Sequence, residues 1–263
     1  MTANQLGALL RRDQITVLVG LIAITAAAWV YLLLGAGIEM DQMDMGGGQV
    51  MLMSPEWTPG HAALVLLMWA VMMAAMMLPS AAPAIVQIAG LADSSAERAY
   101  SIPKALIFVI GYLMIWTGFS FAATFLQWIL DSGNLLSETM AIRDGVVAAL
   151  LVLAAGLFQM TPLKRNCLRR CRSPVRSLSE DQRRSSGAIW RLGLRDGVSC
   201  LGCCWALMCL LFVGGLMNPL WMMAIAFWVF AEKILPGDVD RVSLLGAAGL
   251  VVWGGSSLVI ALV

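Results

Sequence analysis

Charge is scarce in this sequence. Only 13% of its 263 residues are charged and 60% are hydrophobic, whereas about 25% of the residues in soluble domains are charged. Composition therefore excludes a soluble globular protein, and we expect an integral membrane protein. The net charge of +1 also lacks the basic excess that nucleic-acid binding requires, so no nucleic-acid partner is expected.

Histidine and the common catalytic motifs are also missing. The chain has one histidine, His61, which disfavours haem sites with two histidines and histidine-rich di-iron sites. It has no Walker-type glycine loop, no HExxH and no GxSxG, so ATP-driven transport and the common hydrolases find no support. No lysine lies within the last hydrophobic segment, which argues against a retinal protein. We predict no catalytic residues, and a non-enzymatic role is favoured.

Seven hydrophobic segments approach the length of about 20 apolar residues that a helix needs to cross the hydrocarbon core. They lie at about 14–35, 61–80, 105–130, 145–162, 197–217, 219–235 and 242–262. The sequence thus predicts an all-α polytopic transmembrane helical bundle of about seven spans in one domain, 1–263. Its two notable connections are an outer loop rich in Met, Asp and Gly at 36–60 and a basic inner loop at 163–196.

The distribution of positive charge predicts the orientation in the membrane. With the N-terminus inside, every Lys and Arg except Arg143 falls on the inner side. This pattern follows the positive-inside rule and predicts that the N-terminus is inside and the C-terminus outside. All six cysteines then lie within the membrane or on its inner side, so structural disulfides are not expected.

Sulfur is what the sequence has in excess, with 18 Met and 6 Cys. On a helix, Cys200, Cys203 and Cys204 share one face, and Met208 lies on that face two turns after Cys200, while Cys209 points the opposite way. Thiolate and thioether ligands select Cu(I), Zn and related ions, although single cysteines in helices are often packing residues. Three thiols and a thioether on one face favour metal or redox chemistry over packing.

A second sulfur stripe runs through the segment 69–83. Its methionines repeat every four residues as two pairs, Met72 with Met76 and Met73 with Met77. Such stripes are often flexible core filling, but the cysteine cluster elsewhere in the chain raises the weight of a ligand role. Pro79 and Pro83 are expected to end or kink this helix.

The outer loop offers a third group of sulfur atoms. Met43 and Met45 alternate with carboxylates on a glycine-rich stretch. Thioethers in an acidic field suit weak capture of Cu(I), and an ordinary disordered loop is the alternative. His61 follows the loop and is a candidate to pass the ion inward, unless it is only a surface histidine.

Few polar residues remain near the predicted spans. Cys167 and Cys171 share a helix face within the basic inner loop, for which a membrane-surface role is favoured over ligand function. Asp196 lies on the face of the cysteines and could pair with a proton, a cation or an arginine. Glu232 is either a polar or proton-linked group or, with Lys233, marks the inner boundary of a span.

Two runs of residues carry a resemblance to a known family. They are AMMLPSAAP, within 69–83, and CLGCCWALM, at 200–208, the latter followed by Met217-Asn218 and Glu232-Lys233. Together they resemble a bacterial and archaeal family of unknown function described as predicted metal-binding integral membrane proteins. The resemblance covers the second span and residues 196–233, and it implies a polytopic membrane protein with a metal site at Cys200, Cys203 and Cys204.

The leading hypothesis is soft-metal handling. The protein would bind copper(I), with zinc as the alternative ion, and would transport it or deliver it to a cuproprotein. Besides the lipid bilayer, the expected partners are a cuproprotein, a metallochaperone or other subunits of a membrane complex. The alternatives are a membrane thiol redox protein that uses the cysteine cluster and a structural or assembly subunit of a larger complex. Because the resemblance is to prokaryotic proteins, we expect a multi-pass protein of the inner (cytoplasmic) membrane.

Overall fold

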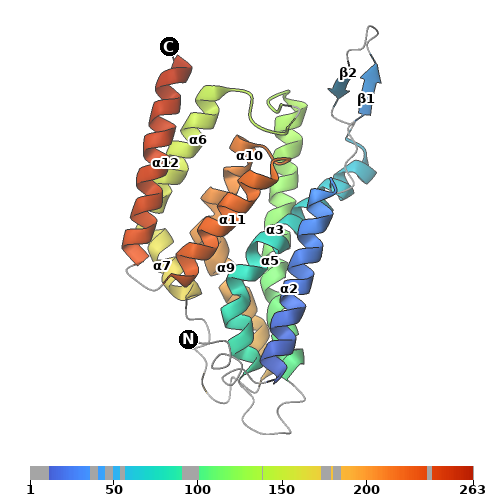
Figure 1. The fold of residues 1–263 in the computed structure, drawn as a ribbon, viewed down its shortest axis with the longest axis vertical. Coiled ribbons are helices and arrows are strands. Elements are labelled where there is room, and N and C mark those ends of the chain that lie inside the picture. Colours follow the sequence, from blue (N-terminus) through green and yellow to red (C-terminus); the bar gives the residue numbers. More distant parts are fainter. Residues whose placement is uncertain are drawn as a thin grey trace.

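The protein is a bundle of long helices (Figure 1). The computed structural model describes residues 12–35, 41–44, 50–53, 57–90, 101–137, 139–172, 179, 185–235 and 239–262. Its elements are α2 (Arg12–Leu33), β1 (Asp41–Asp44), β2 (Val50–Met53), α3 (Pro59–Ala89), α5 (Ser101–Ser132), α6 (Gly145–Gln159), α7 (Pro162–Cys171), α9 (Ser186–Cys209), α10 (Leu211–Gly214), α11 (Pro219–Ile234) and α12 (Val239–Leu262). The predicted all-helical fold is confirmed, with one short antiparallel hairpin of β1 and β2 added to it.

The long helices cross the bundle in alternating directions. In Figure 1, α2, α5, α9 and α12 run from the lower end to the upper end, and α3, α6 and α11 run back. The helix α7 lies at the lower end, and the hairpin projects beyond the upper end. We call these two ends the α7 end and the hairpin end.

The candidate spans are fewer than hydropathy predicts. By length and composition, five described segments could cross a membrane: α2, α3, α5, α12, and α9 with α10. The helices α6 and α7 would make a sixth span if the pair, which is bent by 66°, crosses as one. The seven predicted segments all form helices, but α6 has 15 residues and α11 has 16. At about 1.5 Å per residue these two are shorter than the roughly 30 Å hydrocarbon core. The predicted segments at these places, 145–162 and 219–235, are already shorter than about 20 residues, and they extend past the ends of α6 and α11 by three residues and by one.

Three helices begin with the same two-residue signal, a capping residue followed by proline: Thr58-Pro59 for α3, Thr161-Pro162 for α7 and Asn218-Pro219 for α11. In each, the side-chain oxygen of the capping residue accepts a hydrogen bond from the backbone N–H three residues later, at 3.2 to 3.3 Å. Proline suits the first helical position because its missing N–H would have no partner there. These signals fix the first residues of α3, α7 and α11.

The helix α3 continues through Pro79 and Pro83 to Ala89. Of the two outcomes expected for these prolines, an end near residue 80 is therefore wrong. Each proline removes one hydrogen bond from the helix, and a membrane tolerates this where neighbouring helices surround the backbone. Ser80 lies between the two prolines and donates its hydroxyl to the Met77 carbonyl at 2.8 Å.

The centre of the bundle is formed by α3 and α9. Half of the α3 span and 56% of the α9 span are buried, against 6% for α2 and 11% for α12. Glycines bring α9 close to α5, because a Cβ at Gly197 would meet Ile115 at 2.9 Å and one at Gly111 would meet the Trp190 carbonyl at 2.9 Å. Small residues allow such close approach between membrane helices. The two sulfur stripes thus lie on the two central helices.

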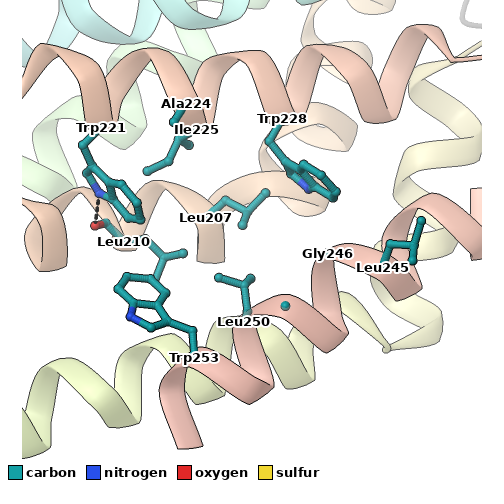
Figure 2. Close-up of a pocket in the computed structure, with 11 residues that line it drawn as sticks. Leu207, Leu210, Trp221, Ala224, Ile225, Trp228, Leu245, Gly246, Leu250 and Trp253 are labelled. Atoms are coloured by element: carbon teal, nitrogen blue, oxygen red, sulfur yellow. Dashed lines mark hydrogen bonds between the residues drawn. The ribbon is translucent and has the colours of Figure 1, made fainter. Parts of the chain in front are cut away.

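An apolar cavity of about 390 Å³ lies between α11 and α12 (Figure 2). Trp221, Trp228 and Trp253 line it together with aliphatic side chains. The indole of Trp221 donates to the Leu210 carbonyl at 2.8 Å, which ties α11 to the end of α9. The lining holds no sulfur and no charge, which separates this cavity from the sulfur stripes.

Candidate functional site

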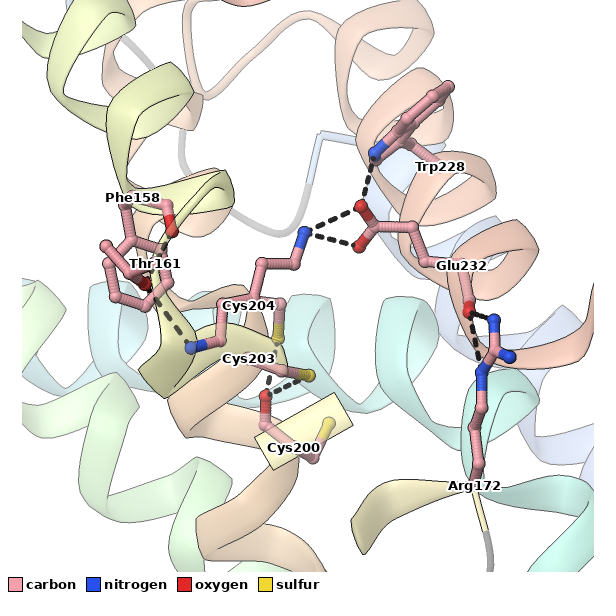
Figure 3. A network of polar contacts seen from close by, with 9 residues as sticks. Phe158, Thr161, Arg172, Cys200, Cys203, Cys204, Trp228 and Glu232 are labelled. Atoms are coloured by element: carbon pink, nitrogen blue, oxygen red, sulfur yellow. Dashed lines mark hydrogen bonds and ion pairs between the residues drawn. The ribbon is translucent and has the colours of Figure 1, made fainter. Parts of the chain in front are cut away.

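The three predicted cysteines of α9 are buried together. Cys200, Cys203 and Cys204 are at most 2% exposed, and Met208, further along the helix, is fully buried. The thiols of Cys203 and Cys204 each donate to the Cys200 carbonyl at 3.0 Å (Figure 3). All six cysteines of the chain are free thiols.

The sulfur of Cys200 points to other helices. Its Sγ lies 2.9 Å from Nζ of Lys233 on α11 and 3.0 Å from the hydroxyl of Tyr112 on α5. The Lys233 ammonium also donates to Oγ of Ser80 on α3 at 2.9 Å. The thiolate is the form of cysteine that binds metals, and an ammonium at this distance is the counter-charge that a buried thiolate requires. Side chains of α5 and α11 therefore contact this sulfur of α9, and α3 is linked to it through Lys233.

A fourth thiol reaches this place from α7. Cys171, the last residue of α7, lies close enough to Cys200 and Cys203 for their side chains to interact. Cys167, one turn earlier, lies over Gly202 of α9, since a Cβ added to that glycine would meet the Cys167 sulfur at 2.8 Å. The predicted shared face of the CxxxC pair thus packs against α9. We call Cys171, Cys200, Cys203 and Cys204 the thiol cluster.

Glu232 of α11 fastens both ends of α7. Its carboxylate accepts hydrogen bonds from Lys164 at 2.6 and 2.8 Å and from the Trp228 indole at 3.0 Å. Its backbone carbonyl accepts from the Arg172 guanidinium at 2.5 and 3.2 Å, just beyond the end of α7 (Figure 3). The ion pair is buried, with Lys164 0% and Glu232 2% exposed. The adjacent residues Glu232 and Lys233 therefore hold α7 and Cys200, respectively.

Asp196 lies one turn before Cys200 on α9 and is 6% exposed. Within the described part of the chain, its Oδ1 has no hydrogen-bond partner. Lys233 is near enough for the two charges to attract each other. A buried carboxylate oxygen without a partner is costly, so the position is consistent with the predicted role as a proton or cation partner, which stays a prediction.

The methionine stripe of α3 connects two places in the bundle. Met72, Met73, Met76 and Met77 are at most 1% exposed. Met77 adjoins the surroundings of the thiol cluster, because its carbonyl accepts from Ser80 at 2.8 Å and from Tyr112 at 3.4 Å. Met72 lines a separate cavity with residues at the hairpin ends of α2 and α11.

The predicted outer residues lie toward the hairpin end. His61 is in the first turn of α3, half-buried, with its ring edge-on to Trp57 at a centroid distance of 5.2 Å. Met43 lies in β1, opposite Met51 in the register of the hairpin. Met45 lies outside the described residues. Their roles as ligands stay predictions.

No ready-made metal site of three or more His, Cys, Asp or Glu side chains occurs within the residues that the structure describes. The direction of the thiols explains this, because Cys203 and Cys204 turn to a carbonyl instead of a common point. Hydrogen bonds from thiols are weak, so these two bonds oppose rotation of the side chains toward Cys200 only weakly. Four neighbouring thiols fit the chemistry of a soft ion such as Cu(I), or of zinc.

Sequence reasoning missed several neighbours of the thiol cluster. Lys233 was expected to mark a span boundary, yet it contacts Cys200 and Ser80. The available signal was the pair Glu232-Lys233 at the end of an apolar segment, because ionisable groups within membrane helices usually serve function. Tyr112 gave no signal, since aromatic residues are ordinary in membrane helices.

Comparison with protein families gives one match. A family model described as "PpoB2: Copper chaperone" matches residues 66–257, nearly three quarters of the chain. This agrees with the metal-binding character that the two sequence runs indicate, but the family carries a different description from the one that we inferred by resemblance. No curated protein and no solved structure matches the chain.

Proposed function

Because the chain belongs to the PpoB2 family of copper chaperones, we propose that it is an integral membrane protein that holds copper(I) in the thiol cluster and delivers it to a cuproprotein. The observation that carries this proposal is the gathering of three thiols, one from α7 and two from α9, around Cys200. Copper is the cargo, and thiolates are the ligands that a soft monovalent ion prefers.

The charges near the cluster suit this cargo. Two thiolates and one Cu(I) carry a net charge of −1, which is expensive inside a membrane without compensation. The Lys233 ammonium, 2.9 Å from the Cys200 sulfur, supplies the compensating charge. Zn²⁺ with four thiolates would leave a net charge of −2, which one ammonium does not balance. Copper(I) is therefore favoured over zinc.

Transfer to a partner requires an accessible ligand. Cys171 is half-buried, whereas Cys200, Cys203 and Cys204 are buried. It ends a helix that is followed in the sequence by further basic residues. A cuproprotein or another copper carrier would therefore exchange ligands first with Cys171. The basic residues around α7 support placing the α7 end on the cytoplasmic side of a prokaryotic inner membrane.

The other sulfur residues complete the proposed path. Met43, Met45 and His61 would gather the ion at the hairpin end. Between that end and the cluster, exchangeable thioethers would come from Met72, Met73, Met76, Met77 and Met208. Thioethers bind more weakly than thiolates, so the ion would move toward the cysteines.

The test is copper binding by the anaerobically purified protein. We expect about one Cu(I) per chain, bound against a chromogenic Cu(I) chelator, and its loss in a Cys171/Cys200/Cys203→Ser variant. Cys209→Ser is the matched control, because Cys209 lies on α9 outside the cluster. Cu(I) held by the triple variant with the affinity of the wild-type protein would contradict the assignment. A metal-free wild-type protein whose thiols titrate as a redox pair would support the thiol redox alternative instead.

A further inference from the structure

Four methionines line a cavity of about 140 Å³ near the hairpin end. Met68 and Met72 come from α3, Met217 from the turn before α11, and Met222 from the first turn of α11. The rest of the lining is aliphatic or backbone and includes Leu32 and Leu216. We call these four methionines with their cavity the thioether pocket.

The pocket is unusual for methionines that serve only as packing. Methionine is flexible and fills irregular gaps in a protein core, and protein interiors leave few voids larger than one water molecule, which takes about 30 Å³ in the liquid. Within the residues that the structure describes, four such side chains line a cavity that they do not fill. In this described lining only their thioether sulfurs are soft donors, and they carry neither charge nor proton.

The pocket is joined to the thiol cluster by one face of α3. Met68, Met72, Met76 and Ser80 follow each other at intervals of four residues, which places them along one stripe. From Met68 to Ser80 the stripe rises by 12 residue steps, or about 18 Å of helix. At its far end, Ser80 accepts a hydrogen bond from Lys233, which also contacts Cys200.

We infer that the thioether pocket is a second binding site for a soft monovalent cation, Cu(I) or its analogue Ag(I), from which the thiol cluster is loaded. That the ion ends in the thiol cluster rests on the proposed function, whereas binding of the ion at the thioether pocket is independent of it. Thioether donors are neutral and hold Cu(I) less tightly than thiolates do, so the pocket takes up the ion reversibly. Met76 is the next thioether along the stripe toward Ser80.

The test separates thioethers from thiols by labelling. A variant with Cys171, Cys200, Cys203 and Cys204 all changed to Ser is produced with selenomethionine and loaded with Cu(I). We expect copper X-ray absorption to give a copper–selenium distance. In the same background, Met68→Leu/Met72→Leu/Met222→Leu should weaken Cu(I) binding about tenfold or more and remove the selenium signal.

The controls keep the outcome interpretable. Met114→Leu/Met160→Leu changes two exposed methionines and should leave Cu(I) affinity and the selenium signal unchanged. Leucine conserves the volume of methionine, so the pocket variant should fold. In the chain with intact cysteines, the same three substitutions should leave the copper content at equilibrium unchanged and slow the loading of copper. The unchanged copper content then verifies that the variant is folded. No copper–selenium distance, or a signal unchanged by the pocket substitutions, would overturn the inference. Failure of the proposed function would instead show as wild-type Cu(I) affinity in the Cys171/Cys200/Cys203→Ser variant.

Discussion

The thiol cluster and the thioether pocket are both built from four sulfur atoms, yet their surroundings differ. Around the thiol cluster, Cys200 contacts an ammonium and a phenol, and a buried ion pair holds α7 in place. Around the thioether pocket the lining is aliphatic or backbone. Thiolates carry charge and need compensation inside a membrane, whereas thioethers do not. As proposed Cu(I) sites, the thiol cluster therefore needs polar groups that balance its charge, whereas the thioether pocket needs only an open space.

The largest expected effect comes from breaking that polar frame at Glu232. Removal of one partner from a buried ion pair typically costs about 3–5 kcal/mol, so Glu232→Ala should lower the free energy of unfolding by that order and release α7. The measurements are unfolding in detergent and the alkylation rate of Cys171, which should rise. The double variant Lys164→Met/Glu232→Leu should recover much of the lost stability, because it leaves no unpaired charge. Unchanged Cys171 alkylation in Glu232→Ala would show that the ion pair does not hold α7.

A second experiment sharpens the contrast between a charged and a neutral site. Lys233→Met removes the ammonium next to Cys200, and we expect Cu(I) affinity at the thiol cluster to fall about tenfold. Lys233→Arg keeps the charge and should lose less. Cu(I) binding at the thioether pocket, measured without the four cysteines, should not respond to either change. Equal losses in Lys233→Met and Lys233→Arg would point to packing instead of charge.

Much of the fold was predictable because it follows from local rules. The hydrophobic segments and the cap-proline signals at Thr58, Thr161 and Asn218 correspond to helices in the structure. The number of spans was less predictable, because the predicted segments 145–162 and 219–235 are shorter than about 20 residues, and the helices α6 and α11 that they form have only 15 and 16. Helical periodicity placed Cys200, Cys203 and Cys204 on one face, and all three are buried.

The parts of the candidate site that the sequence did not predict depend on contacts between distant segments. Cys171 and Cys200 are 29 residues apart and separated by the basic segment, so no periodic pattern connects them. The bend between α6 and α7 turns Cys171 toward α9. Likewise, Met217 and Met222 join Met68 and Met72 only because α11 packs against α3. Periodicity describes a single helix, whereas these sites arise between helices.

The smallest expected effect tests how closely α7 must approach α9. Alanine normally stabilises a helix relative to glycine by up to about 1 kcal/mol. A Cβ at Gly202, however, would meet the Cys167 sulfur at 2.8 Å, whereas a Cβ at Gly255 would meet no atom within 4 Å. Gly202→Ala should therefore displace α7 slightly and be about 1 kcal/mol less stable than the control Gly255→Ala. Because Cys171 lies on the displaced helix, Gly202→Ala should also weaken Cu(I) binding at the thiol cluster and leave the thioether pocket unaffected. If both variants bind copper alike, Cu(I) binding at the thiol cluster does not depend on the close approach of α7 to α9 at Gly202.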